Sequence, residues 1–463
     1  MTIWMPVLDR SKPLYLAIAD AIAKDVDGGT LVDGVRLPPQ RELAWKLGVT
    51  LGTVTRAYKE AEERGLLAGE VGRGSYIRPT RQVAPMPQMP KEASTMIDLS
   101  HAIPPPVVTA EEFDAAMMAV MRDPRRLDLL DYAPPEGFPQ HKTMAANWLK
   151  RSGIDVGEQN VVISAGAHLG FITVLEAMSA PGDKIMAEEV NYALLRNTFR
   201  NAHVEPVPLA MDDDGLLPEA LDKAARVSKS KLLYIVPSLQ NPTTNTMSRR
   251  RRDAIVSIAR KHDLCIIEDD IFRLLDSRTQ PPTFYALAPE RTFHVTSLSK
   301  TLAPGLRIGI IATPEGHDRA LKSHIRSMAP HNVGLAGEIA RHWIETDTAD
   351  AVLTRSRNEL AARRNSFLEI FKGAKFRCEP GAPYGWLQLP AHWTATRFAS
   401  ALAARNVRVS PGAAFHLGPA MPPGNHVRVC FGGPNTGLQA RRGFELIREL
   451  MNESPDDDFT PVA

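Results

Sequence analysis

A lysine in a loop of small and hydroxyl residues is the first group in this sequence that could do covalent chemistry. Lys300 stands in the stretch SLSKTLAPGLRIG, with Ser297 before it and Arg307 after it. The serine and the arginine could hold a phosphate, and the lysine offers one amine able to form an imine. A lone lysine in a loop is more often a solvated surface group, but the residues around Lys300 argue against that interpretation.

Other polar residues follow apolar runs elsewhere in the chain. VPSLQNPTT places Asn241 before a proline, and CIIEDDIF ends an apolar run at Asp269. VVISAGAHLGF turns from a strand into a helix through Gly166 and Ala167, which are small enough for backbone N–H groups at a helix start to meet a phosphate. Ligands of open α/β sheets lie beyond the carboxyl ends of the strands. We therefore expect these residues to lie near Lys300.

This set of groups suits pyridoxal 5′-phosphate. The lysine would form a Schiff base, and an aspartate paired with the pyridinium nitrogen would keep it protonated, so that the ring can act as an electron sink. For the carboxylate of Asp269, a simple ion pair with Arg273 is the alternative.

The elements that must position these residues are short strands alternating with helices. The apolar runs are NVVISAG, DKIMAEE, KLLYIVPS, LCIIEDD and TFHVTSLS, and the helical patterns include HKTMAANWLKRS and RRDAIVSIARKH. Such alternation predicts an α/β sheet covered by helices. The C-terminal part alternates more loosely and predicts a smaller α+β lobe.

Residues 1–79 have a different organisation, with three helical patterns and then a glycine-rich pair of short strands. QRELAWKLG closes at Gly48, where a left-handed residue is needed, and the next pattern begins after Thr50, a suitable N-cap. LLAGEVGRGSYI then predicts a hairpin. Helix, turn, helix and wing together indicate a DNA-reading module.

The remaining segments predict a linker and a tail. Residues 80–96 are rich in proline, and if extended they span roughly 55 Å at about 3.1 Å per residue. The sheet and the smaller lobe are expected over residues 97–450, followed by an acidic tail over 451–463.

Charge and composition exclude several classes of protein. The 463 residues carry a net charge of only +2, and residues 1–79 hold eleven basic against ten acidic side chains, so a helical cap that binds no DNA stays an alternative. No apolar stretch is long enough to span a membrane and the start does not resemble a signal peptide, so we expect a cytoplasmic protein. The three cysteines lack zinc-site spacing, and no metal is expected. The run SRRRRD, which begins at Ser248, predicts a solvated helix start rather than a DNA patch.

Residues from about 97 to 450 resemble the fold-type I aminotransferases. The lysine-to-arginine stretch carries most of this resemblance, which implies that Lys300 forms the Schiff base and that Asp269 pairs with the pyridine nitrogen. The resemblance also implies roles for Asn241 at the ring hydroxyl, for Tyr192 stacked on the ring, and for Ser297, Arg307 and the Gly166 and Ala167 amides at the phosphate. DYAPPEG implies that Tyr132 reaches the site of a neighbouring subunit in a homodimer, and NHVRVCF implies that Arg428 binds a substrate carboxylate.

The first 79 residues resemble the winged helix-turn-helix of GntR regulators, in RLPPQRELAWKLGVTLGTVTRAYKEAEERGLL and in the wing GRGSY. The two halves together resemble the MocR subfamily, in which an aminotransferase-like domain is the sensor of a transcription factor. Side chains at the start of a second helix can enter the major groove, and a wing arginine can reach the backbone or the minor groove. The candidates for contacts with double-stranded DNA are Arg41, Thr50, Thr53, Thr55, Arg56 and Arg73.

Several positions depart from these families. Leu51 stands where relatives often carry arginine, and Ile271 and Phe272 stand where relatives have a tyrosine whose hydroxyl bonds the ring oxygen. Ala165 and His168 replace a hydroxyl and an amide near the phosphate. These changes are compatible with cofactor binding and disfavour efficient catalysis.

The sequence therefore predicts a regulator that binds DNA through its winged helix and senses a small amino compound through a cofactor-bearing domain. Two alternatives remain: an active aminotransferase with a DNA-binding appendage, and a regulator that senses pyridoxal phosphate itself.

Overall fold

The computed structural model describes residues 4–6, 8, 13–27, 31, 35–63, 66–70, 74–77, 96–132, 134–328, 333–418 and 425–454. These residues fall into two compact units, one up to residue 77 and one from residue 96. The predicted linker falls almost wholly outside the described residues, as does most of the predicted tail. The predicted limits of the domains therefore stay predictions.

The N-terminal unit has the predicted order of elements. They are α1 (Leu14–Asp27), α2 (Gln40–Leu47), α3 (Leu51–Glu63), β1 (Leu67–Glu70) and β2 (Gly74–Ile77). Gly48 ends α2 in the left-handed conformation with φ 65°, and the backbone N–H of Thr53 donates to Thr50 Oγ1 at 3.2 Å. Both capping predictions are confirmed.

Three helices of this unit share one apolar core. Ile18 and Ile22 of α1, Leu43 of α2 and Val54 and Ala57 of α3 are all fully buried. Burying a side chain as large as isoleucine contributes about 1.5–3 kcal/mol. The burial of these residues fixes the angle between α2 and α3.

The wing is an antiparallel pair of strands, with Leu67 opposite Ile77. The segment that follows α1 adds to it, because the Leu37 N–H donates to Ser75 O and the Ile77 N–H donates to Val35 O, both at 2.9 Å. The predicted hairpin is confirmed, while Arg73 lies outside the described residues.

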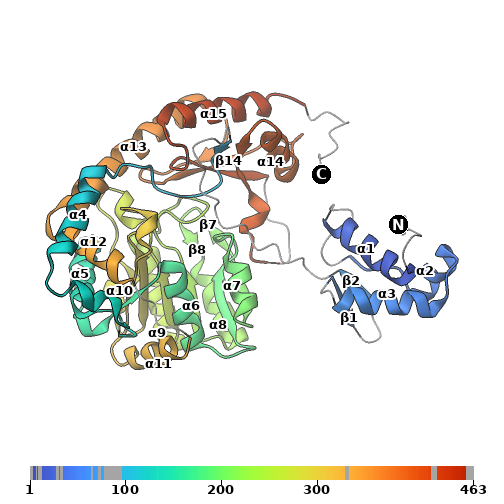
Figure 1. Ribbon diagram of the computed structural model, residues 1–463, viewed down its shortest axis with the longest axis horizontal. Coiled ribbons are helices and arrows are strands. Elements are labelled where there is room, and N and C mark those ends of the chain that lie inside the picture. The colour runs from blue at the N-terminus through green and yellow to red at the C-terminus, as the bar shows by residue number, and fades with distance from the viewer. Residues whose placement is uncertain are drawn as a thin grey trace. The chain divides into compact units, whose positions relative to one another are not determined.

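The C-terminal unit is built on a seven-stranded sheet (Figure 1). In spatial order the strands are β4 (Val161–Ser164), β12 (Gly309–Ala312), β11 (Thr292–Ser297), β10 (Cys265–Asp269), β9 (Leu232–Ile235), β5 (Lys184–Glu188) and β6 (Glu205–Leu209). All five predicted strands are present. Only β12 runs against the others, because residues 298–308 connect it to β11 without a crossover helix.

Helices cover both faces of this sheet. One face is covered by α6 (Ala167–Met178), α7 (Leu195–Asn201) and α11 (Asp318–Met328), and the other by α5 (Pro139–Leu149), α8 (Pro218–Ser228), α9 (Arg249–His262), α10 (Phe284–Leu287) and α12 (Gly334–Glu345). The helix α4 (Ala110–Arg122) packs on α12, and a small hairpin, β7 (Met211–Asp212) and β8 (Gly215–Leu216), precedes α8. The predicted α/β sheet between helices is confirmed.

The smaller lobe, orange to red in Figure 1, is an antiparallel sheet with three helices. Its elements are α13 (Thr348–Ile370), β13 (Phe376–Arg377), β14 (Tyr384–Gln388), α14 (Ala395–Ala404), β16 (Ser410–Pro411), β17 (His426–Cys430) and α15 (Gly437–Met451). The strand β3 (Ile97–Asp98), at the start of the unit, pairs in parallel with β15 (Val407–Arg408). The start of the unit is thereby tied to the small lobe.

Candidate cofactor site and DNA-reading surface

The carboxyl ends of β4, β5, β9, β10 and β11 meet at one edge of the large sheet. These strands run in the same direction, since β12 is the antiparallel member between β4 and β11. Most of the residues predicted to bind the cofactor follow these strands. The fold therefore brings together residues that are more than a hundred positions apart.

Lys300 lies on the connection between β11 and β12, where it is half-buried. Its Nζ donates to the backbone oxygen of Ala102 at 2.6 Å. Burial, followed by repulsion from the Arg428 guanidinium, lowers the pKa of the Lys300 amine to about 8. A much larger share of this amine is neutral at pH 7 than for an ordinary lysine, and the neutral form is the nucleophile.

This lowered pKa predicts the pH dependence of cofactor attachment. Protein stripped of cofactor should react with pyridoxal phosphate faster as the pH rises, with a midpoint near 8 and a plateau above it, because deprotonation of Lys300 produces the nucleophile. Stopped-flow absorbance between pH 6 and pH 10 would measure the rate. A rate that still climbs at pH 10, where an unperturbed lysine titrates, would contradict the assignment.

Asp269 ends β10, and its two carboxylate oxygens differ in their contacts with the described residues. Its Oδ2 accepts a hydrogen bond from the Tyr234 hydroxyl at 2.6 Å, whereas its buried Oδ1 has no partner among the described residues. Burial raises the pKa of this carboxyl to about 6. The alternative of an ion pair with Arg273 is wrong, because Arg273 Nη1 lies 3.6 Å from Asp270 Oδ2 instead. The free oxygen of Asp269 is thus available to a ring nitrogen.

A second buried carboxyl group, Glu188 at the end of β5, influences this site. Its Oε2 accepts from Asn191 Nδ2 at 2.9 Å and from the Val236 N–H at 3.0 Å. Burial, with a smaller contribution from the nearby Asp269, raises the pKa of Glu188 to about 8. Glu188 is therefore mostly protonated and neutral at pH 7, and it leaves Asp269 as the nearby anion.

The predicted phosphate contacts surround the start of α6. Gly166 caps this helix with φ 99°, and a Cβ there would lie 2.8 Å from Arg307 Nη2. The exposed Arg307 reaches back over this turn and donates to Ala165 O at 3.3 Å. The first N–H groups of α6, beginning at Ala167, have no partner within the helix. The turn is thus a cradle of backbone donors below a guanidinium.

The serines before Lys300 add hydroxyl groups to this region. Ser297, a predicted contact, is buried at the end of β11. Ser299 was not predicted, yet its Oγ is buried without a hydrogen-bond partner among the described residues. The position of Ser299 directly before Lys300 in SLSK could have identified it as a further hydroxyl group of the site.

Tyr192 lies beside Tyr234, with ring centroids 6.2 Å apart, and shares a hydrogen bond with His168 Nδ1 at 3.0 Å. Burial lowers the pKa of His168, and the charge of Arg307 lowers it further. A neutral His168 therefore holds the Tyr192 hydroxyl, and the tyrosine ring is kept at the same edge of the sheet as Asp269.

Arg428 joins two parts of the site. Its Nη1 donates to Asn241 Oδ1 at 2.7 Å and its Nη2 to the backbone oxygen of Ser100 at 2.5 Å, while its buried Nε has no partner among the described residues. The guanidinium carbon also lies 4.6 Å from the ring centroid of Phe415. The two predicted residues, Asn241 and Arg428, are in direct contact.

Tyr132 is not brought into this site. Its side chain is 91% exposed at the surface of the unit. The predicted role of Tyr132 in the site of a neighbouring subunit stays a prediction.

The residues that are present fit pyridoxal 5′-phosphate. The partnerless Oδ1 of Asp269 suits a protonated ring nitrogen, the cradle at Gly166 suits a phosphate, and Lys300 supplies the amine. Tyr234, which orients the other oxygen of Asp269, was missed, because it reads as one more apolar residue of a buried strand.

Next to Asp269 in the chain lies a buried cluster of side chains that could ligate a metal ion, but its negative charges are already paired with arginines. Glu268, Asp270 and His294 place ligand atoms within 4.8 Å of one another. However, Arg252 and Arg273 approach the two carboxylates at 3.8 and 3.6 Å. The arginines already supply the cations that these acids need.

The prediction that SRRRRD is a solvated helix start is confirmed for Ser248, Arg249 and Arg250, which are exposed, and is wrong for Arg252. Ser248 does cap α9, but Arg252 is fully buried and donates to the backbone oxygens of Met247 and Pro237 at 3.1 and 3.0 Å. Arg252 points inward because it lies on the buried face of α9, since residues three or four positions apart in a helix share one face.

The candidate DNA-reading surface is the exposed side of α3 and the start of α2. Thr55 Oγ1 donates to Gln40 Oε1 at 2.8 Å and so ties the two helices together. Arg56 is exposed and its guanidinium carbon lies 3.8 Å from the ring centroid of Tyr15. Of the other candidates, Arg41 and Thr50 are exposed and Thr53 is half-buried.

Replacing Arg56 by alanine should weaken DNA binding by about 1–3 kcal/mol if a base contact is lost. Fluorescence anisotropy with duplex DNA from the chain's own promoter region would measure the change. Lys24→Ala, which removes an equal charge from the exposed end of α1, is the matched control. Equal affinities of both variants and the original protein would remove Arg56 from the reading surface.

None of the helices formed by the described residues is long and apolar enough to cross a bilayer.

Comparisons with known proteins agree with both units. Residues 96–440 match the family model of aminotransferase class I and II, and residues 14–77 match that of the bacterial regulatory proteins of the gntR family. An archaeal alanine:glyoxylate aminotransferase has a similar fold, with a TM-score of 0.72 and 24% identity over 78% of this chain and 91% of that chain.

Similar full-length proteins are named as regulators. The uncharacterized HTH-type transcriptional regulator YdeF of Bacillus subtilis is 28% identical over 97% of both chains. The pyridoxine biosynthesis regulator PdxR of Corynebacterium glutamicum is 28% identical over 74% of both chains, and the vitamin B6 salvage repressor PtsJ of Salmonella typhimurium is 29% identical over 82% of this chain and 86% of that protein. This chain belongs to the aminotransferase class I and II family and joins that fold to a GntR-type DNA-binding domain, as MocR regulators do.

Proposed function

We propose that this GntR-type regulator senses a small amino compound at its pyridoxal phosphate site and reports it by changed DNA binding. The observation that carries the proposal is the pairing of a reactive amine with a carboxylate-binding group in one site: Lys300, with its lowered pKa, and Arg428, with a free Nε. A winged helix in the same chain provides the output.

When bound, pyridoxal phosphate supplies a carbonyl carbon that can exchange one amine for another and a ring that withdraws electrons. Lys300 would hold the cofactor through its Nζ, and when not attached to the cofactor this amine could hold a proton. Arg428 binds and orients the carboxylate of the incoming compound. Asp269 holds the negative charge opposite the ring nitrogen. A change in DNA binding requires that the compound bind one arrangement of the protein more tightly than another.

Two other functions are each favoured by a specific observation. The neutral fraction of Lys300 and the free Oδ1 of Asp269 also suit an active aminotransferase. The names of PdxR and PtsJ favour a regulator that senses vitamin B6 itself. A regulator that contacts the chromosome would act in the cytoplasm.

A titration separates these functions. Protein loaded with pyridoxal phosphate would be mixed with single amino acids, with a 2-oxo acid present as amino-group acceptor, while cofactor absorbance and DNA affinity are recorded together. Sensing predicts that one compound changes both, with little turnover. Rapid turnover without any change in DNA affinity indicates the enzyme, and a DNA response to the cofactor alone indicates the vitamin sensor.

We also propose that the protein is a homodimer whose subunits meet around α4 and the 3₁₀ turn Arg126–Leu130. Large apolar side chains are exposed there, including Met121 at 63%, Leu127 at 66% and Leu130 at 82%. Clustered exposure of this kind marks interaction surfaces. Tyr132, 91% exposed directly after this turn, would then reach the partner's cofactor.

Leu130→Glu should shift the protein toward monomers and weaken cofactor binding with it, because a charge would be buried between subunits and Tyr132 would lose its target. Sedimentation velocity at micromolar concentration measures the mass. Leu438→Glu is the matched control, since Leu438 is equally exposed, at 82%, on α15. An original protein that is monomeric with cofactor bound would contradict the proposal.

A further inference from the structure

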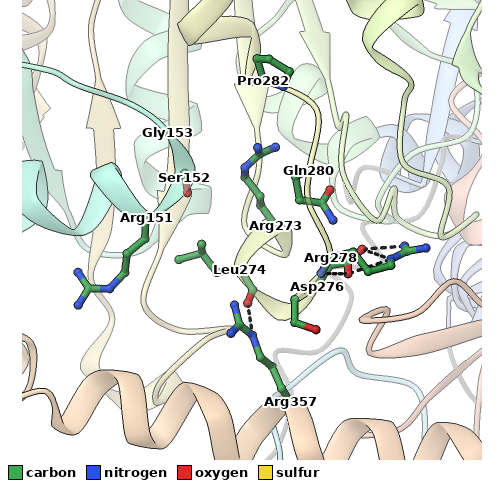
Figure 2. Close-up of a pocket in the computed structure, with 11 residues that line it drawn as sticks. Arg151, Ser152, Gly153, Arg273, Leu274, Asp276, Arg278, Gln280, Pro282 and Arg357 are labelled. Carbon is green, nitrogen blue, oxygen red and sulfur yellow. Dashed lines mark hydrogen bonds and ion pairs between the residues drawn. The ribbon is translucent and has the colours of Figure 1, made fainter.

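The charges around the cavity of about 470 Å³ in Figure 2 are balanced within the protein. Each of the four arginines on its wall has an acidic partner: Arg151 with Asp350, Arg273 with Asp270, Arg278 with Asp276, and Arg357 with both Asp276 and Asp350. Because these pairs account for the arginines, we assign no ligand to the cavity.

Leu51, the first residue of α3, is an apolar side chain on the candidate DNA-reading surface. It is 43% exposed, whereas Val54 and Ala57 of the same helix are fully buried in the core of the N-terminal unit. The residue that follows Leu51 is the exposed Gly52, where a Cβ would lie 3.8 Å from Thr50 Oγ1, an ordinary contact. The start of α3 therefore offers an apolar side chain next to backbone that a base pair can approach.

The hydroxyl groups near Leu51 already have partners within the protein. Thr50 Oγ1 and Thr53 Oγ1 share a hydrogen bond of 2.9 Å, and the Thr53 N–H donates to Thr50 Oγ1 at 3.2 Å. Thr55 Oγ1 donates to Gln40 Oε1 at 2.8 Å. These bonds fix the start of α3, so the position from which Leu51 meets DNA is fixed as well.

The chemistry of DNA identifies the group that an exposed leucine can recognise. The first residues of the second helix of a helix-turn-helix contact base edges in the major groove. Those edges carry one apolar group, the C5-methyl group of thymine. A leucine side chain cannot bond the polar atoms of a base, so contact with this methyl group is the interaction that would remove its apolar surface from water.

We propose that Leu51 contacts the C5-methyl group of a thymine in the DNA site and thereby determines which base pair is read there. Like the proposed function, this role rests on DNA binding by the winged helix, but it does not depend on the amino compound. Leu51 is then a residue that sets sequence preference, whereas a cation such as Arg56 can also bind the phosphates of any sequence.

A duplex selected from a random pool by the full chain provides the probe. Each thymine of that duplex is replaced in turn by deoxyuridine, which removes the methyl group and keeps the O4 acceptor and the base pairing. At the thymine that Leu51 contacts, affinity should fall about fourfold, the loss that corresponds to one buried CH₂ group. Fluorescence anisotropy measures the affinities.

Variants of the protein assign the effect to one side chain. Leu51→Ala should bind the thymine and deoxyuridine duplexes equally, because the shorter side chain does not reach the methyl group, and Leu51→Met should keep the preference for thymine. Leu14→Ala is the matched control, since Leu14 is also the first residue of a helix and is 37% exposed. Its fourfold difference should persist. Leu51→Arg should select guanine instead, because arginine bonds O6 and N7 of that base.

The proposal is overturned if no deoxyuridine substitution weakens binding, or if Leu51→Ala keeps the full preference for thymine. In either case the selected duplex still binds, so the proposed function stands. A full chain that selects no duplex from the pool would instead overturn both this role of Leu51 and the DNA-binding output of the proposed function.

Discussion

Lys300→Ala is expected to lose all covalent attachment of pyridoxal phosphate and all response to the amino compound, while keeping its basal affinity for DNA. The reason is that Lys300 is the amine at the edge of the sheet where the cofactor's other contacts meet, whereas the DNA-reading surface belongs to a separate compact unit. Absorbance of the bound cofactor and fluorescence anisotropy with DNA would be measured on the same preparation.

Lys300→Arg is the matched control for charge. Arginine can still donate to Ala102 O but cannot form an imine, so it should behave like the alanine variant in the absorbance assay. A Lys300→Ala protein that still switched normally with the amino compound would show that the sensing proposal is wrong.

Asp269→Asn is expected to weaken cofactor binding by about 1.5–3 kcal/mol, roughly 10- to 150-fold, because a hydrogen bond to a charged group is replaced by one to a neutral amide. Asparagine keeps the size of the side chain and an acceptor for Tyr234. Equilibrium dialysis at pH 7 would give the affinity, with Lys300→Ala as the background in both proteins so that only non-covalent binding is compared.

Glu188→Gln provides the contrast. With a pKa raised to about 8, Glu188 carries a proton at pH 7, so glutamine resembles its native state and the affinity should hardly change. An equal loss of affinity in both variants would mean that Asp269 has no special place at the ring nitrogen.

Features set by local backbone rules could be predicted from the sequence, whereas buried helix faces and strand directions could not. Gly48 and Thr50 were predicted correctly because caps obey local backbone rules. The strand β12 was not predicted, because SLSKTLAPGLRIG reads as a binding loop while its end begins an antiparallel strand. Arg252 was misinterpreted because a run of charges says nothing about which helical face is buried.

Within the candidate site, side chains with distinctive chemistry could be predicted and backbone groups could not. The contact between Asn241 and Arg428 joins two residues chosen from separate motifs. The carbonyls of Ser100 and Ala102 leave no signature in the sequence, since every residue has a backbone carbonyl. Their position depends on the pairing of β3 with β15, a long-range contact that no local pattern encodes.

The carbonyls of Ser100 and Ala102 compete with bound ligands for the side chains of Arg428 and Lys300. Ser100 O accepts from Arg428, which a bound amino acid would need, and Ala102 O accepts from the Lys300 amine, which the cofactor would need. Hydrogen bonds to charged groups contribute about 1.5–3 kcal/mol, so each one that a ligand must displace raises its apparent dissociation constant by roughly tenfold or more. The measured affinity for the amino compound will thus reflect the difference between the free energy of its own contacts and that of the carbonyl contact it displaces. A change that loosens residues 99–102 should therefore tighten ligand binding without adding any contact to the ligand.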